Sequence, residues 1–198
     1  VMGFTKKLAE IIIQSKDLHT KLAARFISVR FGNVLGSTGS VVPFFKQQIK
    51  QGGPLTVTDK NVSRFFMTIQ EAVDLVMSAT FEQLNSEGYR KGSISVLDMG
   101  GSVKIDTLAK QMIKMAGFTP GKEIKIKYTG LKKGEKLHEK LFANEEKKVD
   151  KFHKGFFIVT NDILNTNLIY KMVERLEVLC NYTNKDIRKD LFKIIKKR

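Results

Sequence analysis

Residues 29–45 read Val-Arg-Phe-Gly-Asn-Val-Leu-Gly-Ser-Thr-Gly-Ser-Val-Val-Pro-Phe-Phe, and this stretch decides the fold. At its start, residues 25–31 alternate apolar with polar side chains and are rich in β-formers, which predicts a strand. A glycine-rich loop follows over residues 32–39, and Ser40 is placed to cap a helix over residues 41–51. A strand that feeds a helix through a glycine loop is typical of α/β folds.

Strands and helices continue to alternate along the rest of the chain. Strand patterns are predicted at residues 55–58, 65–69, 93–98 and 124–128. Helical periodicity predicts helices at residues 2–14, 70–84 and 103–116, one beginning near Glu135, and two more from about Asn167, separated near residues 182–184. This alternation favours an α/β fold with parallel strand pairing, whereas the short Thr-rich strand and the hairpin-like turns favour a mixed second lobe.

Composition excludes several classes of function. The chain of 198 residues is 42% hydrophobic, which suits a globular protein, and its apolar runs are too short to cross a bilayer. A single cysteine favours a reducing compartment, so we expect a cytoplasmic protein, and three scattered histidines form no metal-ligand pattern. The net charge of +15 comes mainly from lysines spread along the chain, which favours solvated faces over a specific nucleic-acid surface. A basic polyanion-binding protein remains an alternative.

The first predicted helix carries a spaced pair of side chains. Met2 and Lys6 are four residues apart and therefore share one helix face. A thioether does not exchange a proton at neutral pH, so Met2 cannot act as an acid or a base. On spacing alone, a core methionine beside a surface lysine is the simpler interpretation.

Two further features favour an anionic ligand. The loop over residues 32–39 leads into a helix N-terminus, which offers free backbone N–H groups and a favourable dipole. Arg64 enters an otherwise apolar strand, where its guanidinium needs an anionic partner. That partner is either a phosphate or a structural carboxylate, for which Asp59 and Glu71 are the candidates. Thr68 and Glu71 also form a Thr-x-x-Glu pattern, which predicts a structural capping box.

Taken together, the chain resembles the CapD-like polysaccharide biosynthesis family over four segments. These segments are residues 1–10, 29–45, 58–73 and 129–141. The family consists of extended short-chain dehydrogenases/reductases that include UDP-N-acetylglucosamine 4,6-dehydratases and epimerases. The resemblance implies an α/β fold, the C-terminal part of a Rossmann-type enzyme with a mixed α/β substrate-binding lobe. It divides the chain into a remnant of the dinucleotide-binding domain, a nucleotide-sugar-binding lobe and a helical extension, over residues 1–35, 36–150 and 151–198.

The resemblance also implies roles for individual residues. Lys6 matches the lysine that holds a nicotinamide ribose, and Met2 stands at the usual tyrosine position, as in the larger family members. On the nucleotide-sugar side, Asn33 is implied to contact the diphosphate, and Arg64 to reach a phosphate or the ribose. The residues implied to lie near the nucleobase are Val42, Pro43 and Phe44.

The last of the four segments resembles the family's Gly-Leu-Arg-Pro-Gly-Glu-Lys-Leu-x-Glu stretch. Lys132 takes the place of the arginine that clamps the diphosphate, and Glu135 that of the glutamate that meets the ribose hydroxyls. Lys132 lacks the bidentate fork of an arginine, and Lys133 replaces a rigid proline, so we expect looser phosphate holding. The alternative is a solvated basic turn before a helix.

The sequence contains no Gly-x-x-Gly-x-x-Gly after a strand, and the resemblance implies that this dinucleotide cradle lies upstream in the family. We therefore expect a fragment that depends on the missing N-terminal part of the same enzyme. We also expect it to be inactive alone and not to retain the NAD or NADP of full-length relatives. Exposed apolar surface along the helix of residues 2–13 would indicate an inert fragment.

The expected function is the nucleotide-sugar side of a 4,6-dehydratase acting on a UDP-N-acetylhexosamine. In the family reaction, hydride leaves C4 of the sugar for NAD(P)⁺, and loss of the C6 hydroxyl then gives a 4-keto-6-deoxy sugar. An epimerase returns the hydride to the opposite face instead. A UDP-sugar 4-epimerase fragment and an inactive remnant are therefore alternatives. The expected partners are a UDP-sugar, the missing part of the enzyme and a second copy of the chain, with no specific nucleic acid.

Overall fold

The computed structural model describes all residues except 1, 86–89, 144–145, 153–154, 161–165 and 182–198. A four-stranded sheet with the order β1-β6-β10-β9 forms its larger part. Its strands are β1 (Ser28–Arg30), β6 (Ile94–Leu97), β9 (Lys147–Phe152) and β10 (Phe156–Thr160). β1 pairs with β6 in parallel, and β10 runs antiparallel to both β6 and β9.

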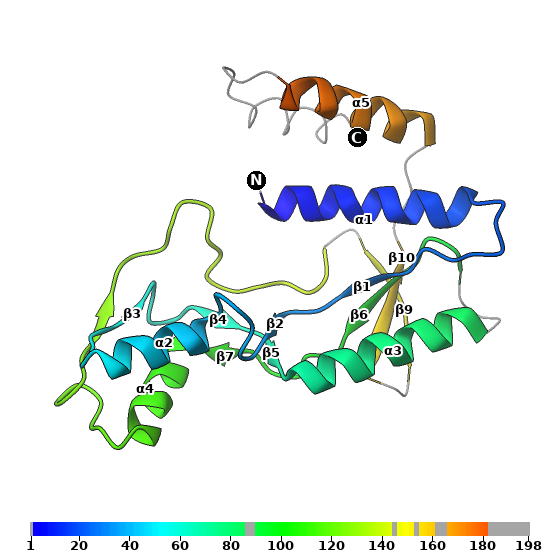
Figure 1. Ribbon diagram of the computed structural model, residues 1–198. Coiled ribbons are helices and arrows are strands. Elements are labelled where there is room, and N and C mark those ends of the chain that lie inside the picture. Colours follow the sequence, from blue (N-terminus) through cyan, green and yellow to red (C-terminus); the bar gives the residue numbers. More distant parts are fainter. Residues whose placement is uncertain (1, 86–89, 144–145, 153–154, 161–165, 182–198) are drawn as a thin grey trace.

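Helices cover both faces of this sheet. α1 (Met2–His19) lies on one face and α3 (Ile69–Asn85) on the other, and α5 (Thr166–Cys180) lies along the far side of α1 (Figure 1). Because β6 is sandwiched in this way, all four of its residues are buried, including Ser95, whose hydroxyl accepts a hydrogen bond from Gln83 of α3. α3 turns the small side chains of Ala72 and Ala79 toward the sheet.

A second core lies beside the sheet, under α2 (Val41–Lys50) and α4 (Ile105–Met115). Phe45 of α2 is fully buried there against Ile113 of α4 and against β3 (Leu55–Val57). β3 pairs in parallel with β8 (Ile126–Tyr128), and β4 (Ser63–Arg64) pairs antiparallel with β7 (Val103–Lys104). β2 (Asn33–Val34) and β5 (Phe66–Met67) pair in parallel between this smaller lobe and the sheet (Figure 1).

Most predicted elements are present, but the helix expected near Glu135 is wrong. Residues 131–141 form a turn at Gly134, with φ of +86°, followed by an extended segment. The Ser63 N–H donates to the carbonyl of Leu137 at 3.0 Å, and His138 forms a β-bridge with Ser63. The backbone groups of this segment thus pair with β4, so they are not available for helical hydrogen bonds.

Two other expectations need correction. β9 was not predicted because four of its six residues are charged, and β10 was missed although its aromatic and β-branched residues favour a strand. Residues 151–198 contribute β10 to the sheet as well as the helix α5, and the division of the chain into three domains stays a prediction. Ser40 occupies the N-cap position of α2, but its hydroxyl makes no capping hydrogen bond. The second helix predicted in the tail lies outside the described residues.

Within the described part of the chain, no helix combines the length and the apolar character needed to cross a bilayer.

Candidate functional site

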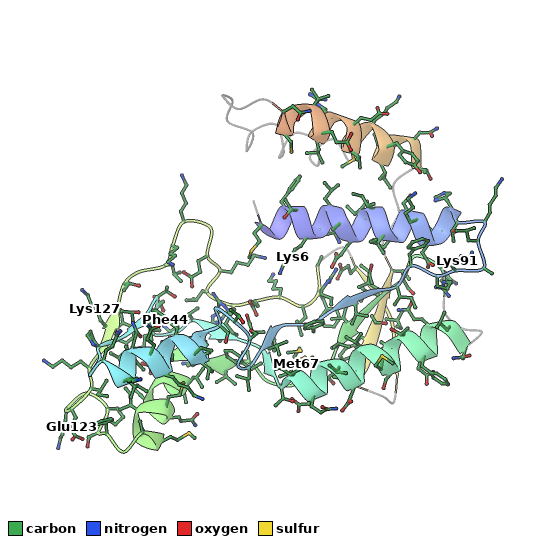
Figure 2. All side chains as sticks on the ribbon, viewed as in Figure 1. Lys6, Phe44, Met67, Lys91, Glu123 and Lys127 are labelled. Atoms are coloured by element: carbon green, nitrogen blue, oxygen red, sulfur yellow. The ribbon has the colours of Figure 1, made fainter. Side chains whose placement is uncertain are left out.

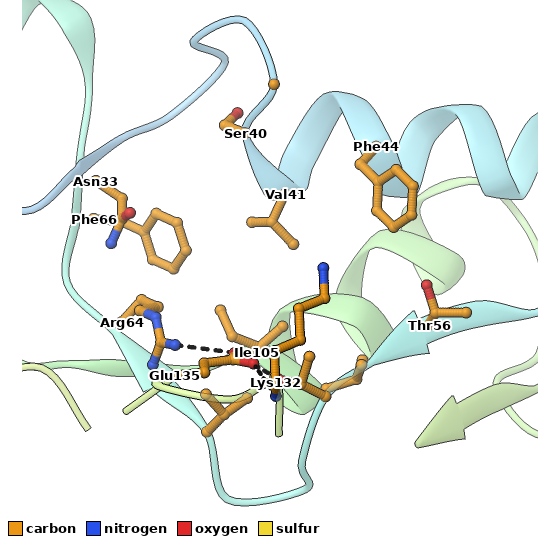
Figure 3. A pocket seen from close by; sticks show the side chains of 14 residues that line it. Asn33, Ser40, Val41, Phe44, Thr56, Arg64, Phe66, Ile105, Lys132 and Glu135 are labelled. Carbon is orange, nitrogen blue, oxygen red and sulfur yellow. Dashed lines mark hydrogen bonds and ion pairs between the residues drawn. The ribbon is translucent and has the colours of Figure 1, made fainter. Parts of the chain in front are cut away.

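A pocket of about 430 Å³ opens in the smaller lobe, between the start of α2, the strands β3 and β4, and the turn that precedes Glu135 (Figure 3). Five of the residues implied by the family resemblance line it. They are Asn33, Phe44, Arg64, Lys132 and Glu135. They come from four separate places in the sequence, so only the fold brings them together. Figure 3 shows the side chain of Lys132 reaching up from its turn into this space.

Arg64 lies in the pocket wall and is held from one side. Its Nη1 donates to the main-chain carbonyls of Ser63 at 2.8 Å and Leu137 at 3.2 Å, and its Nη2 donates to Glu135 Oε1 at 3.2 Å. Its Nε faces Glu139 Oε1 at 3.6 Å, which is an ion pair without a hydrogen bond. The carboxylate partners are therefore Glu135 and Glu139, and the sequence-based alternatives Asp59 and Glu71 are wrong.

Glu135 is fixed by several donors. Its Oε1 also accepts from the Thr58 hydroxyl at 2.8 Å, and its Oε2 accepts from the backbone N–H of Lys132 at 3.0 Å. These hydrogen bonds hold the carboxylate of Glu135 in the pocket wall, beside the guanidinium of Arg64. A carboxylate in such a position can accept hydrogen bonds from hydroxyl groups of a ligand.

The N-terminus of α2 forms the opposite wall. Gly39 and Ser40 line the pocket there, and Gly36 and Gly39 both have positive φ, which a glycine adopts without strain. The hydroxyl oxygen of Ser40 is buried and has no hydrogen-bond partner. Phe44, one turn further along α2, is 48% exposed and presents an aromatic face. This wall therefore offers backbone donors and an apolar surface to one ligand.

The other implied residues lie elsewhere. Val42 and Pro43 belong to α2 but do not line the pocket. Lys6 and Met2 are exposed on α1, and Figure 2 labels Lys6 on that helix and Phe44 on α2. Thr68 and Glu71 form the predicted capping box: each backbone N–H donates to the other's side chain, at 2.7 and 3.1 Å. The backbone N–H and the hydroxyl of Thr68 both donate to Glu71 Oε2 and lower the pKa of Glu71, whose role is structural.

A second arginine, Arg30 of β1, forms an ion cluster with glutamates that do not line the pocket. Its Nε and Nη2 donate to Glu10 of α1 at 2.9 Å, and its Nη1 and Nη2 donate to Glu146, also at 2.9 Å. Burial alone would raise the pKa of Glu146, but hydrogen bonds from Arg30 and the Ala143 N–H outweigh it and lower this pKa to about 2. The Glu146 side chain is only 1% exposed, so this cluster is structural.

Sequence reasoning missed Glu139 and Thr58. Glu139 contacts both Asn33 and Arg64, and Thr58 contacts Glu135. Glu139 falls inside the quoted family stretch but was assigned to a helix, which hid its direction. The described residues contain no cluster of three or more histidine, cysteine or carboxylate side chains that could hold a metal ion.

The α/β architecture and the pocket define the C-terminal part of a Rossmann-type extended short-chain dehydrogenase/reductase, as the sequence predicted. The polysaccharide biosynthesis protein family model matches residues 1–161, and the chain belongs to this family.

Individual relatives agree with this assignment. The capsular polysaccharide biosynthesis protein CapD of Staphylococcus aureus is 47% identical over 146 residues, which cover 74% of this chain and 23% of CapD. The UDP-glucose 4-epimerase of Rickettsia akari is 32% identical over 200 residues, covering 99% of this chain and 55% of the relative. The crystal structure of Pen from Bacillus thuringiensis superposes with a TM-score of 0.65 at 34% identity, over 81% of this chain and 48% of Pen. The chain thus spans about a quarter of CapD and about half of the other two.

Proposed function

We propose that this chain is the nucleotide-sugar-binding portion of an NAD(P)-dependent sugar-nucleotide 4,6-dehydratase that serves surface polysaccharide biosynthesis. The proposed ligand is a UDP-N-acetylhexosamine. One observation carries this proposal: Arg64, Lys132, Glu135, Asn33 and Phe44, which the family resemblance selects, all line a single pocket. The names of the matching family and of CapD support a role in polysaccharide biosynthesis.

The pocket has a suitable group for each part of a nucleoside diphosphate. Arg64 retains one Nη2 hydrogen beyond the hydrogen bonds described above, while its Nε faces Glu139, and Lys132 adds a second cation. Together with the N-terminus of α2 they would hold the diphosphate. Glu135 would accept from the ribose hydroxyls, and the exposed ring of Phe44 would pack against the base. The chain's share of the reaction is thus to bind and orient the sugar nucleotide.

A UDP-sugar 4-epimerase fragment is the second candidate. The relative from Rickettsia akari, which matches almost the whole chain, carries that name. Both reactions begin with the same sugar-nucleotide binding, so the pocket serves either. A dehydratase releases water from C6 and an epimerase does not, and product analysis of a reconstituted enzyme separates the two.

The family resemblance implies one NAD(P)-binding residue in this chain. Of the residues implied for NAD(P), this chain supplies Lys6, which is exposed on α1 beside an exposed Met2. No glycine-rich cradle for a pyrophosphate follows a strand in the sequence. We therefore assign no chemical step to NAD(P) on these residues, and we expect the purified chain to retain neither NAD nor NADP.

The apolar face of α3 supports a further α/β unit as a partner. Five large apolar side chains of this helix are 52–65% exposed: Ile69, Val73, Met77, Phe81 and Leu84. At about 100° per residue they form one continuous stripe. Exposed apolar surface was considered for α1, but its residues Leu8 and Ile11 are buried. The exposed apolar stripe lies on α3 instead.

The position of this stripe indicates what covers it. Leu75 of α3 packs near Gly155, between β9 and β10, and the stripe lies on the opposite flank of the helix. β1 lies at the edge of the sheet opposite to β9. We propose that a helix of the missing N-terminal part packs along the stripe, while one of its strands extends the sheet at β1. In the chain alone, Met77→Gln and Phe81→Gln should reduce the binding of an apolar dye. Unchanged dye binding would contradict the proposal, and self-association through the stripe would indicate a second copy instead.

Calorimetric titration of the 198-residue chain with UDP and UDP-N-acetylglucosamine tests the proposed function. We expect saturable binding of both ligands, and about tenfold or greater weakening by Arg64→Ala, because a charged hydrogen bond is lost. The matched control is Arg175→Ala on α5, an exposed arginine far from the pocket in sequence. Absence of binding by the wild-type chain would contradict the proposal. Binding that Arg175→Ala weakens as much as Arg64→Ala would favour a basic polyanion-binding protein.

A further inference from the structure

One carboxylate engages two side chains that border the pocket. Oε2 of Glu139 accepts from Nδ2 of Asn33 at 3.2 Å, and Oε1 of Glu139 forms an ion pair with Nε of Arg64 at 3.6 Å. Asn33 and Arg64 both line the pocket, whereas Glu139 is not among the lining residues. The two oxygens of this carboxylate thus bridge an amide and a guanidinium, as two oxygens of a phosphate group also can.

The N–H groups of these two side chains are almost fully used. Nδ2 of Asn33 carries two hydrogens, and besides Glu139 it donates to the main-chain carbonyl of Phe65 at 3.1 Å. Arg64 donates through Nη1 to two main-chain carbonyls and through Nη2 to Glu135, which leaves one Nη2 hydrogen and the Nε–H that faces Glu139. An anionic ligand can therefore accept from Asn33 only after one of the two present acceptors of that amide has moved.

Of these two acceptors, Glu139 is the one that can move. The carbonyl of Phe65 also accepts the backbone N–H of Asn33 at 2.9 Å, beside the pairing of β2 with β5, so the sheet fixes its position. Glu139 is held at 3.2 and 3.6 Å, whereas Glu135 is held by three donors at 2.8–3.2 Å. The side chain of Glu139 is 34% exposed, and its backbone belongs to neither a helix nor a strand. Its carboxylate can therefore turn toward water and regain hydration there.

Charge favours such an exchange when the ligand is a diphosphate. A diphosphate beside Arg64 is an anion, and the carboxylate of Glu139 on the same guanidinium repels it. Once Glu139 has turned away, the Nε–H of Arg64 and one N–H of Asn33 are available, and both are donors that suit a phosphate oxygen. The exchange replaces one bridging anion with another, and the lost contacts of Glu139 reduce the net affinity.

Resting on the proposed function, we propose that Glu139 is an autoinhibitory carboxylate, a built-in competitor that the diphosphate of the ligand displaces from Asn33 and Arg64. The pocket wall then has two arrangements. In one, Glu139 bridges the two side chains, and in the other, phosphate oxygens take its place. A ligand that binds only one of two arrangements loses apparent affinity in proportion to the population of the other. Glu139 thus sets the affinity of the pocket for a sugar nucleotide.

Substitution of Glu139 tests this inference through the sign of the effect. UDP binding is measured by calorimetric titration for the wild-type chain, Glu139→Gln and Glu139→Ala. Glu139→Gln keeps the size of the side chain and removes its charge, and it should tighten UDP about threefold, whereas Glu139→Ala removes both contacts and should tighten UDP about fivefold. A residue that merely supports Asn33 and Arg64 would give weaker binding in both variants. Unchanged or weaker UDP binding by Glu139→Gln overturns the inference, and this variant decides if Glu139→Ala does not fold.

Two controls separate this inference from an effect of net charge and from the proposed function. Glu174→Gln makes the same substitution at an exposed glutamate of α5, and it should leave UDP affinity within about twofold, because salt screens a distant exposed charge. Tightening by Glu174→Gln as large as that by Glu139→Gln would overturn the inference. If Arg64→Ala weakens UDP and Glu139→Gln does not tighten it, the inference fails while the proposed function stands. If the wild-type chain does not bind UDP, both fail.

Discussion

Two arginines of this molecule are each placed between two glutamates, yet their surroundings differ. Arg30 uses all five of its N–H donors, at distances of 2.7–2.9 Å, on Glu10, Glu146 and the carbonyl of Leu141. Arg64 has its two carboxylate partners at 3.2 and 3.6 Å and borders the pocket. A saturated guanidinium can only hold the fold together, whereas an unsaturated one beside a cavity can still take an anion. The number of unused donors therefore distinguishes a structural arginine from a ligand-binding one.

The largest expected effect is on stability, at the saturated arginine. Arg30→Ala removes five hydrogen bonds from the cluster and leaves Lys7 as the cation beside Glu10 and Glu146, at 3.7 and 3.4 Å. We expect a loss of about 3 kcal/mol in the free energy of unfolding. Urea denaturation followed by circular dichroism measures it. Arg64→Ala is the matched variant and should cost about 1 kcal/mol, because its carboxylates are more loosely held. Equal losses in the two variants would remove the distinction between the arginines.

Acid should weaken the Arg30 cluster through Glu146. Its pKa is about 2 in the folded chain and about 4.5 in an unfolded one, so the cluster's contribution is complete above about pH 4.5. That contribution is lost as the pH falls from about 4.5 to about 2. Urea midpoints at pH 7 and pH 3 for the wild type and Glu146→Gln check this. The destabilisation caused by Glu146→Gln should be smaller at pH 3, and a constant difference would contradict the assignment.

Gly32 follows Arg30 by two residues and packs closely against Phe65, the residue after Arg64. A Cβ at this position would lie 2.9 Å from Phe65 Cβ and 3.0 Å from the Phe65 carbonyl oxygen. Gly32→Ala should therefore cost about 2 kcal/mol, because the backbone of Phe65 must shift. It should also weaken UDP-N-acetylglucosamine binding, since that carbonyl holds the Asn33 amide. Gly101→Ala is the control, because no heavy atom lies within 4 Å of its added Cβ.

The smallest expected effect concerns the support of Glu135. Thr58→Val removes the hydroxyl that donates to Glu135 Oε1 at 2.8 Å, while the Lys132 N–H remains on the other oxygen. We expect UDP affinity to fall about threefold, and stability to change by about 1 kcal/mol or less. Calorimetric titration of UDP measures the first and urea denaturation the second. A loss as large as that of Arg64→Ala would mean that the ligand contacts Thr58 directly.

The sequence anticipated the elements and the pocket residues better than the contacts between them. Periodicity was sufficient for α2, α3 and α4, because their buried faces repeat regularly. The family resemblance selected residues that share one pocket, although their spacing alone would not have grouped them. Proximity in the sequence did not identify the carboxylate partners of Arg64. The candidates were nearby carboxylates, whereas the actual partners lie 71 and 75 residues further along the chain.

The same limit explains the role of Glu139. In the helix expected from about Glu135, the two glutamates would share one exposed face. In the extended segment they contact Arg64 from different sides, one inside the pocket wall and one behind it. The sequence did not indicate the ion cluster of Arg30 either, because a polar residue is common in a strand of alternating pattern. Long-range pairing of charged groups depends on the tertiary fold, which local patterns do not specify.

The most direct test of the account observes the two guanidinium groups themselves while ligand is added. NMR spectra of the nitrogen-labelled chain resolve the Nε–H signals of individual arginines during a titration with UDP. We predict that the Nε–H signal of Arg64 and the backbone N–H signals of Ser40 and Val41 shift with saturation, whereas the Nε–H signal of Arg30 does not move. Shifts at Arg30 without shifts at Arg64, or no shift at either, would contradict the assignment of the pocket to a nucleotide sugar.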